Sequence, residues 1–201
     1  MYVRTIYLTG DPARVDRTVE RIKDDAVGLL TEQDGYRGAS IFVDRTVGTI
    51  LLGSWWETRE AEQASLTAMK GWREDVLGAF GGTATVDVWE AAVARRGDPV
   101  EGGAFRLVRL EFEPGSGADR LAASFEATAV KGLEALDGFI GGALLVDRDK
   151  GTGSVGVIFR DRAALDASRG PQALLRAKAA EAAGVRVRSI EEFDVALLHR
   201  P

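Results

Sequence analysis

The chain has 201 residues, of which 45% are apolar and 28% are charged, and its formal net charge is −5. These proportions are those of an ordinary globular protein, and without an excess of basic residues we expect no nucleic-acid partner. Because the chain has no cysteine, disulfide bonds, iron–sulfur clusters and cysteine-ligated zinc are excluded.

The sequence also gives expectations about location and metals. No apolar run approaches the ~20 residues that cross a bilayer, and MYVRTIYLTGDP at the N-terminus does not have the pattern of a signal peptide. We therefore expect a cytoplasmic protein with no membrane partner. A single histidine, His199, is too little for a metal site of usual composition, so we expect no metal.

The N-terminal segment predicts a strand followed by a helix. Residues 2–10, YVRTIYLTG, are rich in β-branched and aromatic side chains, which favour strands. Asp11 and Pro12 are typical of a helix start. Apolar residues then recur at helical spacing, at Val15, Val19, Ile22, Ala26 and Leu30.

Two strands, a second helix and a fourth strand are expected next. Residues 39–44 and 49–56 are apolar runs joined by a short hairpin, in which Gly48 supplies the positive φ that such turns need. Thr58 is a candidate cap for a helix that reaches about Phe80. The segment TATVDVWEAAV that follows predicts the fourth strand.

The same pattern returns in the second half of the chain. Residues 34–65 and 137–168, which are 103 positions apart, match without a gap at 13 of 32 positions. The matched residues include Gly35/Gly138, Gly48/Gly151 and Ser65/Ser168. We interpret this self-similarity as a tandem repeat.

Each repeat has the strand–helix–strand–strand–helix–strand order of a ferredoxin-like unit. Helices cover only one face of such a sheet, yet the strand-like runs are apolar on both faces, so both must be buried. We therefore predict an α+β fold in which the antiparallel sheets of the two repeats pack face to face as a pseudo-dimeric barrel within one chain. The predicted boundaries are 1–97 for the first repeat, 98–104 for a linker and 105–201 for the second repeat.

These tandem units, with WWETREAEQAS leaving the third strand, resemble the dimeric α+β barrel superfamily, and most closely the antibiotic biosynthesis monooxygenase (ABM) domain. In that family the third strand ends in an aromatic–glutamate pair. Trp56-Glu57 matches this pair, whereas Phe159-Arg160 keeps only the aromatic residue. The resemblance implies a barrel that two chains usually form, and an activity such as oxygenation of an aromatic compound without a cofactor. Other members degrade haem, isomerise their substrates or have no known activity.

The residues that haem-degrading members use are missing from this chain. Those members have a histidine on the second helix and an asparagine on the first strand. Here there is no asparagine, and the helix positions concerned hold Ala64-Ser65 and Ala167-Ser168. We therefore expect no haem and no other cofactor. Some oxygenases of the family also rely on the asparagine, although tyrosine, tryptophan and arginine serve there too.

One glycine motif suggests a nucleotide at first sight. GTGSVG, at residues 151–156, has the spacing of a dinucleotide-binding loop. The segment VGVIF that continues from it is a strand pattern, where the fingerprint requires a helix. We interpret the motif as a hairpin that enters a strand.

Candidate site residues follow from alternation along the strands. If Arg4, Ile6 and Leu8 face the helices, their alternates face the space between the two sheets. We assign Tyr7 and Arg109 as candidate catalytic residues that hold an oxyanion of the substrate. The candidate substrate-binding residues are Ser54, Trp56, Asp87, Trp89 and Glu111.

A cavity lined by these aromatic and polar residues suits a flat, hydrophobic or aromatic small molecule. The alternative is that Trp56 and Trp89 are plain core residues, with Arg109 and Glu111 a pair at a strand end. Two functions stay open: a cofactor-independent monooxygenase acting on a phenol-like compound, and a non-catalytic small-molecule-binding or stress-related barrel. A homodimer of the whole chain is also open. Because the two halves differ at the candidate positions, we expect only the first to carry a working pocket.

Overall fold

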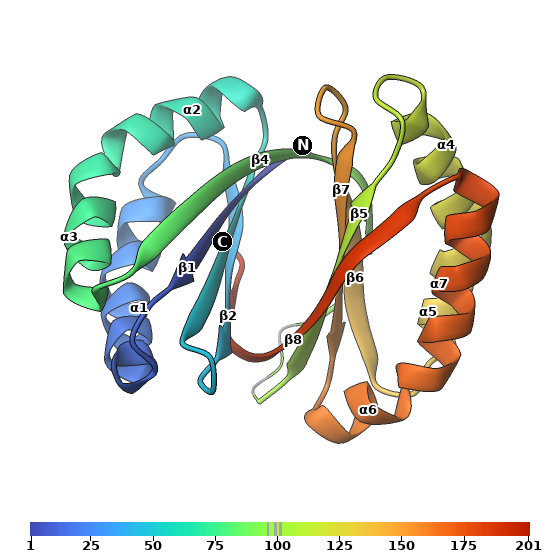
Figure 1. The fold of residues 1–201 in the computed structure, drawn as a ribbon. Coiled ribbons are helices and arrows are strands. Elements are labelled where there is room, and N and C mark those ends of the chain that lie inside the picture. The colour runs from blue at the N-terminus through green and yellow to red at the C-terminus, as the bar shows by residue number, and fades with distance from the viewer. Residues whose placement is uncertain (96, 99, 101) are drawn as a thin grey trace. The chain divides into compact units, whose positions relative to one another are not determined.

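The structure is a computed structural model that describes residues 1–201 except 96, 99 and 101. Strands and helices follow in the expected order (Figure 1). The elements of the first half are β1 (Tyr2–Thr9), η1 (Pro12–Arg14), α1 (Val15–Thr31), β2 (Tyr36–Asp44), β3 (Thr49–Trp56), α2 (Arg59–Ala68), α3 (Lys70–Phe80) and β4 (Thr83–Arg95). Those of the second half are β5 (Ala104–Glu111), α4 (Gly117–Ser124), η2 (Phe125–Val130), α5 (Lys131–Glu134), β6 (Phe139–Asp147), β7 (Thr152–Phe159), α6 (Arg162–Ala167), α7 (Arg169–Ala183) and β8 (Arg186–His199).

The expected helix starts are confirmed, and one expected helix is divided. Asp11 caps the first helical segment through its side chain, which accepts a hydrogen bond from the Ala13 amide at 2.9 Å. Thr58 caps α2 in the same way. The single helix expected from Thr58 to about Phe80 is wrong, because the backbone leaves helical geometry at Met69. The Met69 side chain is buried at this bend and belongs to the core of unit 1.

The strands pair in an antiparallel way throughout the pairings described. β3 lies between β1 and β2, and β7 lies between β5 and β6. The hydrogen-bonded order β1-β3-β2-β8-β5-β7-β6-β4 closes on itself as a barrel. The predicted α+β class with a closed antiparallel barrel is therefore confirmed.

The chain forms two compact units that differ from a simple division in half. Unit 1 comprises Met1–Trp89 and Val195–Pro201, and unit 2 comprises Glu90–Asp194. β4 therefore begins in unit 1 and continues into unit 2, whereas β8 begins in unit 2 and ends in unit 1. The predicted repeat boundaries at 97 and 105 concern sequence correspondence and stay a prediction. Residues 99 and 101 of the predicted linker 98–104 lie outside the described residues.

Local geometry recurs at the offset of 103 residues. Gly35 and Gly138 both have φ of 73°, and each follows the helical segment at the start of a unit. An aspartate–arginine ion pair recurs with the same N–O distance of 2.7 Å, Asp16–Arg45 in unit 1 and Asp119–Arg148 in unit 2. The two halves thus share local structure as well as sequence, and their origin by duplication stays a prediction.

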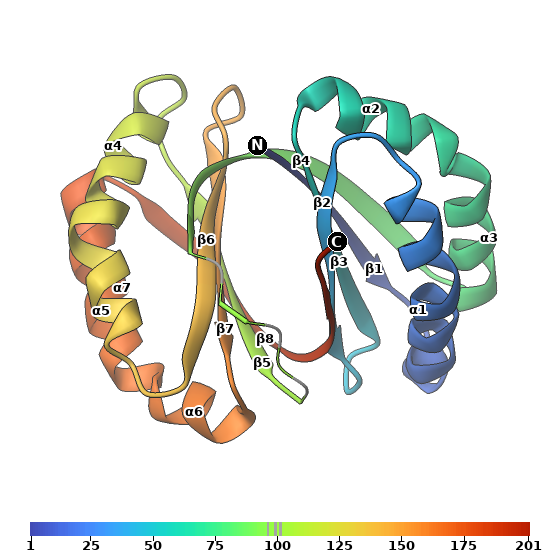
Figure 2. The same ribbon diagram turned by 180° about the vertical axis from the view of Figure 1, so that it is seen from behind.

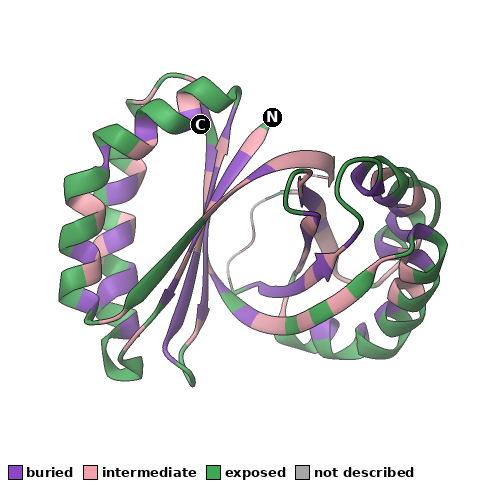
Figure 3. Ribbon diagram, turned by 45° about the horizontal axis from the view of Figure 1, so that its top comes forward, coloured by how far each residue is buried: buried purple, intermediate pink, exposed green. Residues whose placement is uncertain are grey.

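Each unit has its own core between its sheet and its helices. Figure 1 shows α1, α2 and α3 on one face of the sheet of unit 1, and Figure 2 shows α4, α5 and α7 on one face of the sheet of unit 2. The helices turn buried residues toward the sheets and exposed residues outward (Figure 3). As expected, Ile6 and Leu8 of β1 belong to the core of unit 1, and Val108 and Leu110 of β5 to that of unit 2. None of the helices in the described part of the chain is long and apolar enough to cross a membrane.

Candidate functional site

Unit 1 contains a cavity between the sheet and the helices α1 and α3. Its volume is about 50 Å³, and its polar wall includes Arg4 and Ser54 from two neighbouring strands, together with Arg73 from α3. The strand register explains this wall, because Arg4 of β1 lies opposite Ser54 of β3 and both point to the helix side. The rest of the lining is mainly apolar and includes Ile6, Ile22 and Leu52.

A second, more open cavity of about 430 Å³ adjoins the first. The two cavities share Ile6, Leu52, Trp72 and Arg73 as lining residues. Trp72 and Arg73 therefore lie where the inner cavity meets the wider one. This arrangement gives an inner compartment with an aromatic ring and a cation at its entrance, which is typical of small-molecule sites.

Arg4 is the central polar group of the inner cavity. Its side chain is 3% exposed, and Nη1 donates to the Glu62 carboxylate at 3.1 Å and to Ser65 Oγ at 2.9 Å. The guanidinium also lies 5.3 Å from the ring centre of Trp56. Within the part of the chain that the structure describes, its Nε is buried without a hydrogen-bond acceptor. A buried donor without a partner is costly, so this N–H is an unsatisfied polar group in the wall of the cavity.

Burial makes both arginines of this cavity poorly solvated cations. It lowers the pKa of Arg4, although the neighbouring Glu62 opposes this shift. Burial also lowers the pKa of Arg73, whose Nη1 donates to the Leu66 carbonyl at 2.6 Å. Two carboxylates lie near these guanidinium groups, Glu74 beside Arg73 and Glu62 beside both.

Two of the residues predicted from sequence lie on the helix side of the sheet instead of the opposite side. The register pairs Tyr2 with Trp56 and Arg4 with Ser54, so the expected orientation of Ser54 and Trp56 is wrong by one residue. An error of one residue reverses the face of every side chain in a strand. Ser54 still lines a cavity, and its Oγ accepts a hydrogen bond from Trp56 Nε1 at 2.9 Å. Trp56 is fully buried behind Ser54 and Arg4.

Three other predicted residues lie on the sheet face away from the helices. Trp89 Nε1 donates to Thr5 Oγ1 at 2.8 Å. Thr5 and Tyr7 are two residues apart in β1, so their side chains point to the same face of the sheet. Asp87 precedes Trp89 by two residues in β4 and so shares its face. Tyr7 and Asp87 are half-buried, and Trp89 is buried. The structure thus gathers these three on one face, while their role in binding stays a prediction.

Arg109 and Glu111 lie in unit 2, where both make ion pairs. Arg109 Nε donates to Glu191 at 2.9 Å. Glu111 accepts from Arg186 at 2.6 Å and from Arg188, and these arginines lower the pKa of its carboxyl group. A shared cavity of these residues with Tyr7 stays a prediction.

The positions of His199, Arg4 and Arg73 were not assigned to a site by sequence reasoning. His199 Nδ1 lies 3.0 Å from the Tyr36 hydroxyl, and burial raises the pKa of Tyr36 to about 12. The one signal for the arginines is their recurrence, because Arg73 and Arg176 are 103 residues apart and Arg4 and Arg106 are 102 apart. No group of three or more metal-ligating side chains occurs among the residues that the structure describes.

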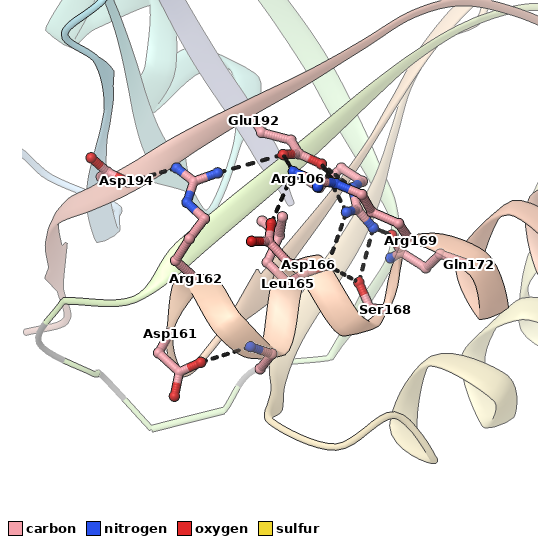
Figure 4. Close-up of polar contacts among 11 residues, drawn as sticks. Arg106, Asp161, Arg162, Leu165, Asp166, Ser168, Arg169, Gln172, Glu192 and Asp194 are labelled. Carbon is pink, nitrogen blue, oxygen red and sulfur yellow. Dashed lines mark hydrogen bonds and ion pairs between the residues drawn. The ribbon is translucent and has the colours of Figure 1, made fainter.

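Unit 2 uses the counterpart of Arg4 differently (Figure 4). Arg106 is 2% exposed and donates to the Leu165 carbonyl at 3.0 Å, to Ser168 Oγ at 2.9 Å and to Gln172. Its Nη2 also pairs with Glu192 of β8 at 2.8 Å. Arg4 has a matching carbonyl and serine but leaves Nε free, whereas Arg106 has four partners. Arg106 is therefore a structural anchor for β8.

Glu192 should make the stability of the protein depend on pH in the acid range. Bonds from Arg169 and Arg106 lower its pKa from 4.5 to about 2. A lowered carboxyl pKa stabilises the folded state fully above about pH 4.5, and this stabilisation is lost as the pH falls toward 2. We expect Glu192→Gln to cost about 2 kcal/mol in urea unfolding at pH 7 and progressively less between pH 4.5 and 2. Asp194→Asn, at a half-exposed carboxylate, is the control, and an equal loss at pH 7 for both variants would contradict the assignment.

Comparisons with solved structures show the fold of the chain. A protein of Lactobacillus acidophilus that is provisionally described as a monooxygenase has a TM-score of 0.72 at 9% identity, over 99% of this chain and 96% of that chain. One of Fusobacterium nucleatum with the same provisional description has a TM-score of 0.73 at 10% identity, over 99% and 94%. An anthrone oxidase-like protein has a TM-score of 0.67 at 12% identity, over 99% and 93%. At such identities the likeness shows the fold, an antiparallel α+β barrel.

Sequence comparison shows the family. No family model matches the chain. The uncharacterized protein Rv2558 of Mycobacterium tuberculosis (strain H37Rv) is 31% identical over 204 residues, which cover 99% of this chain and 85% of that protein. Rv2557 of the same strain is 30% identical over 200 residues, which cover 99% and 89%. The chain belongs to the family of these two mycobacterial proteins.

Proposed function

We propose that unit 1 binds a small aromatic compound as its oxyanion and oxygenates it with O₂ without a cofactor. The observation that carries the proposal is the pair of poorly solvated arginines, Arg4 and Arg73, that line a cavity that is otherwise mainly apolar. This location replaces the space between the two sheets as the favoured site. The structural relatives described as monooxygenases and as anthrone oxidase-like support the activity by analogy of fold.

The chemistry asks little of the protein beyond binding and charge stabilisation. An anthrone-like or hydroquinone-like substrate that loses a proton becomes an electron-rich anion, which can itself reduce O₂. For an anthrone, one O₂ adds to the carbanion and the resulting peroxide loses one water to leave a quinone. Arg4 and Arg73 would hold the substrate oxygen and stabilise its negative charge, which is more effective in a dry cavity.

Binding without turnover is the second candidate, and one observation favours it. The ionisable side chains that line the inner cavity, among the described residues, are Arg4 and Arg73. Neither accepts a proton at neutral pH, so the lining of the inner cavity offers no general base among the described residues. A substrate would have to arrive as its anion, or the protein would only store or carry it.

Oxygen uptake measures the activity directly. We expect uptake with at least one compound from a panel of anthrones, hydroquinones and catechols. Saturable quenching of tryptophan fluorescence with no uptake from any of them would leave the binding function alone, since Trp72 lines both cavities.

Arg73→Gln tests the site. Loss of a charge-assisted hydrogen bond costs about 1.5–3 kcal/mol, so we expect Kd for the best panel compound to rise about 10–100-fold. The matched control is Arg176→Gln, at the corresponding position of unit 2, which should leave this Kd unchanged. If Tyr7→Phe and Arg109→Gln weaken binding and Arg73→Gln does not, the cavity predicted from sequence is the correct one.

A further inference from the structure

Unit 2 has a cavity of its own, of about 60 Å³, between its sheet and its helices. Phe125 and Ala129 of η2, Val155 and Val157 of β7, and Leu175 of α7 form much of its lining. The polar lining residues are Gln172, whose side chain is engaged by Arg106, and Arg176. The cavity is therefore apolar apart from one free cation at its wall.

This cavity occupies the same place in unit 2 as the inner cavity does in unit 1. The lining residues correspond at the offset of 103: Ile22/Phe125, Ala26/Ala129, Leu52/Val155, Ser54/Val157, Trp72/Leu175 and Arg73/Arg176. Valine replaces the serine of the polar wall, and leucine replaces the tryptophan at the entrance. The arginine is kept, as Arg73 in α3 and Arg176 in α7. Unit 2 thus has an equivalent pocket with a less polar interior.

Arg176 is a cation without a counterion. Its side chain is half-buried in α7, and within the described ranges it has no hydrogen bond or ion pair. Burial and the charge of the nearby Arg106 both lower its pKa. Arg106 is itself engaged by Glu192, and among the described residues no carboxylate forms an ion pair with Arg176. A half-buried guanidinium beside an apolar cavity is matched by an anion with an apolar body.

The helical wall of the cavity also departs from regular geometry. η2 is a π-helix of six residues between α4 and α5, whereas α1 is a regular α-helix through the corresponding positions. Two residues of the π-helix, Phe125 and Ala129, line the cavity. Such segments are rare and occur often at functional sites. Their presence beside the cavity of unit 2 alone gives that pocket a distinct wall.

We propose that unit 2 binds a second small molecule, a carboxylate with a short apolar body, whose two oxygens pair with Arg176. The apolar body occupies the cavity beside Phe125 and Val155. Because the interior of this pocket has no counterpart of Ser54 or of the free Nε of Arg4, its ligand differs from that of unit 1. The expectation that only the first half would carry a pocket is then replaced by two pockets of different selectivity.

The experiment uses the whole chain with methyl-labelled leucine and valine, and hexanoate as the probe. We expect hexanoate to shift the NMR signals of Val155 and Leu175 in a saturable way, and hexanol, which lacks the charge, to bind at least 10-fold more weakly. Arg176→Gln should weaken hexanoate about 10–100-fold and leave hexanol unchanged. Arg73→Gln is the matched control in unit 1 and should not affect these signals.

Several outcomes would overturn the proposal. These are the absence of a hexanoate-dependent shift at Val155 and Leu175, equal affinities for hexanoate and hexanol, and an Arg176→Gln variant that binds hexanoate normally. Ala129→Leu, which reduces the cavity, should abolish the shifts from both probes if the apolar body lies there. The readout comes from unit 2 alone, so it is independent of whether unit 1 oxygenates or binds its own ligand.

Discussion

Arg106→Met is expected to lower the free energy of unfolding by about 3–5 kcal/mol, the range for removal of one partner from a buried charge network. Arg106 is 2% exposed and bonds to four groups from α6, α7 and β8 (Figure 4). Its loss leaves the side chains of Ser168 and Gln172 buried without this donor. The measurement is urea unfolding followed by circular dichroism.

Arg162→Met is the matched control for this prediction. Arg162 belongs to the same cluster and pairs with Asp194 at 2.6 Å, but its side chain is 44% exposed. Ion pairs at such exposure contribute about 0–1 kcal/mol. All tryptophans lie in unit 1, so their fluorescence reports separately on that unit. Similar losses from both variants would show that burial of Arg106 does not set its contribution.

Trp56→Ala is expected to lower the free energy of unfolding by about 3–5 kcal/mol, as for other large aromatic residues removed from a core. Trp56 is 0% exposed, packs edge-on against Tyr36 with ring centres 5.7 Å apart, and hydrogen-bonds Ser54. The substitution also removes the ring against which the Arg4 guanidinium lies. Thermal and urea unfolding would both measure the loss.

Trp72→Ala separates a core role from a binding role. Trp72 is half-buried, and its Nε1 lies 3.4 Å from Asp25 on α1. We expect a smaller loss of stability than for Trp56→Ala, because less apolar surface is uncovered. Its effect on binding of an aromatic compound should be larger, since it lines both cavities of unit 1. The opposite order of effects would indicate that Trp56 contacts the ligand.

Sequence reasoning succeeded where local interactions determine the structure. Asp11 and Thr58 cap helices because their side chains bond to backbone amides two or three residues away. Gly48 and Gly151 close equivalent hairpins at positive φ, where a side chain would be strained. The internal repeat allowed the order of strands and helices in one half to be checked against that in the other half.

The sequence-based predictions were wrong where the structure depends on the exact register of a strand or on a contact between residues far apart in the sequence. Ser54 and Trp56 were assigned to the wrong face because the pairing of β3 with β1 cannot be read from either strand alone. The bend falls at Met69, a residue buried in the core of unit 1, and no breaker residue at that position marks it in the sequence. The acceptors of α2 reach Nη1 of Arg4 and leave its Nε without a partner. The amino-acid sequence does not show which nitrogen an acceptor reaches.

The continuation of β8 from unit 2 into unit 1 has a consequence for synthesis on the ribosome. Val195–His199 completes unit 1 beside β2, where His199 meets Tyr36, yet these residues emerge only after the whole of unit 2 has been made. The nascent N-terminal sheet therefore waits with the edge of β2 unpaired, and such edges invite pairing with other chains. Pairing of β8 with β2 is expected to be slow, because the two strands are far apart in the sequence. Cells that make this protein at a high rate would thus depend on chaperones during translation more than they would for two independently folding domains.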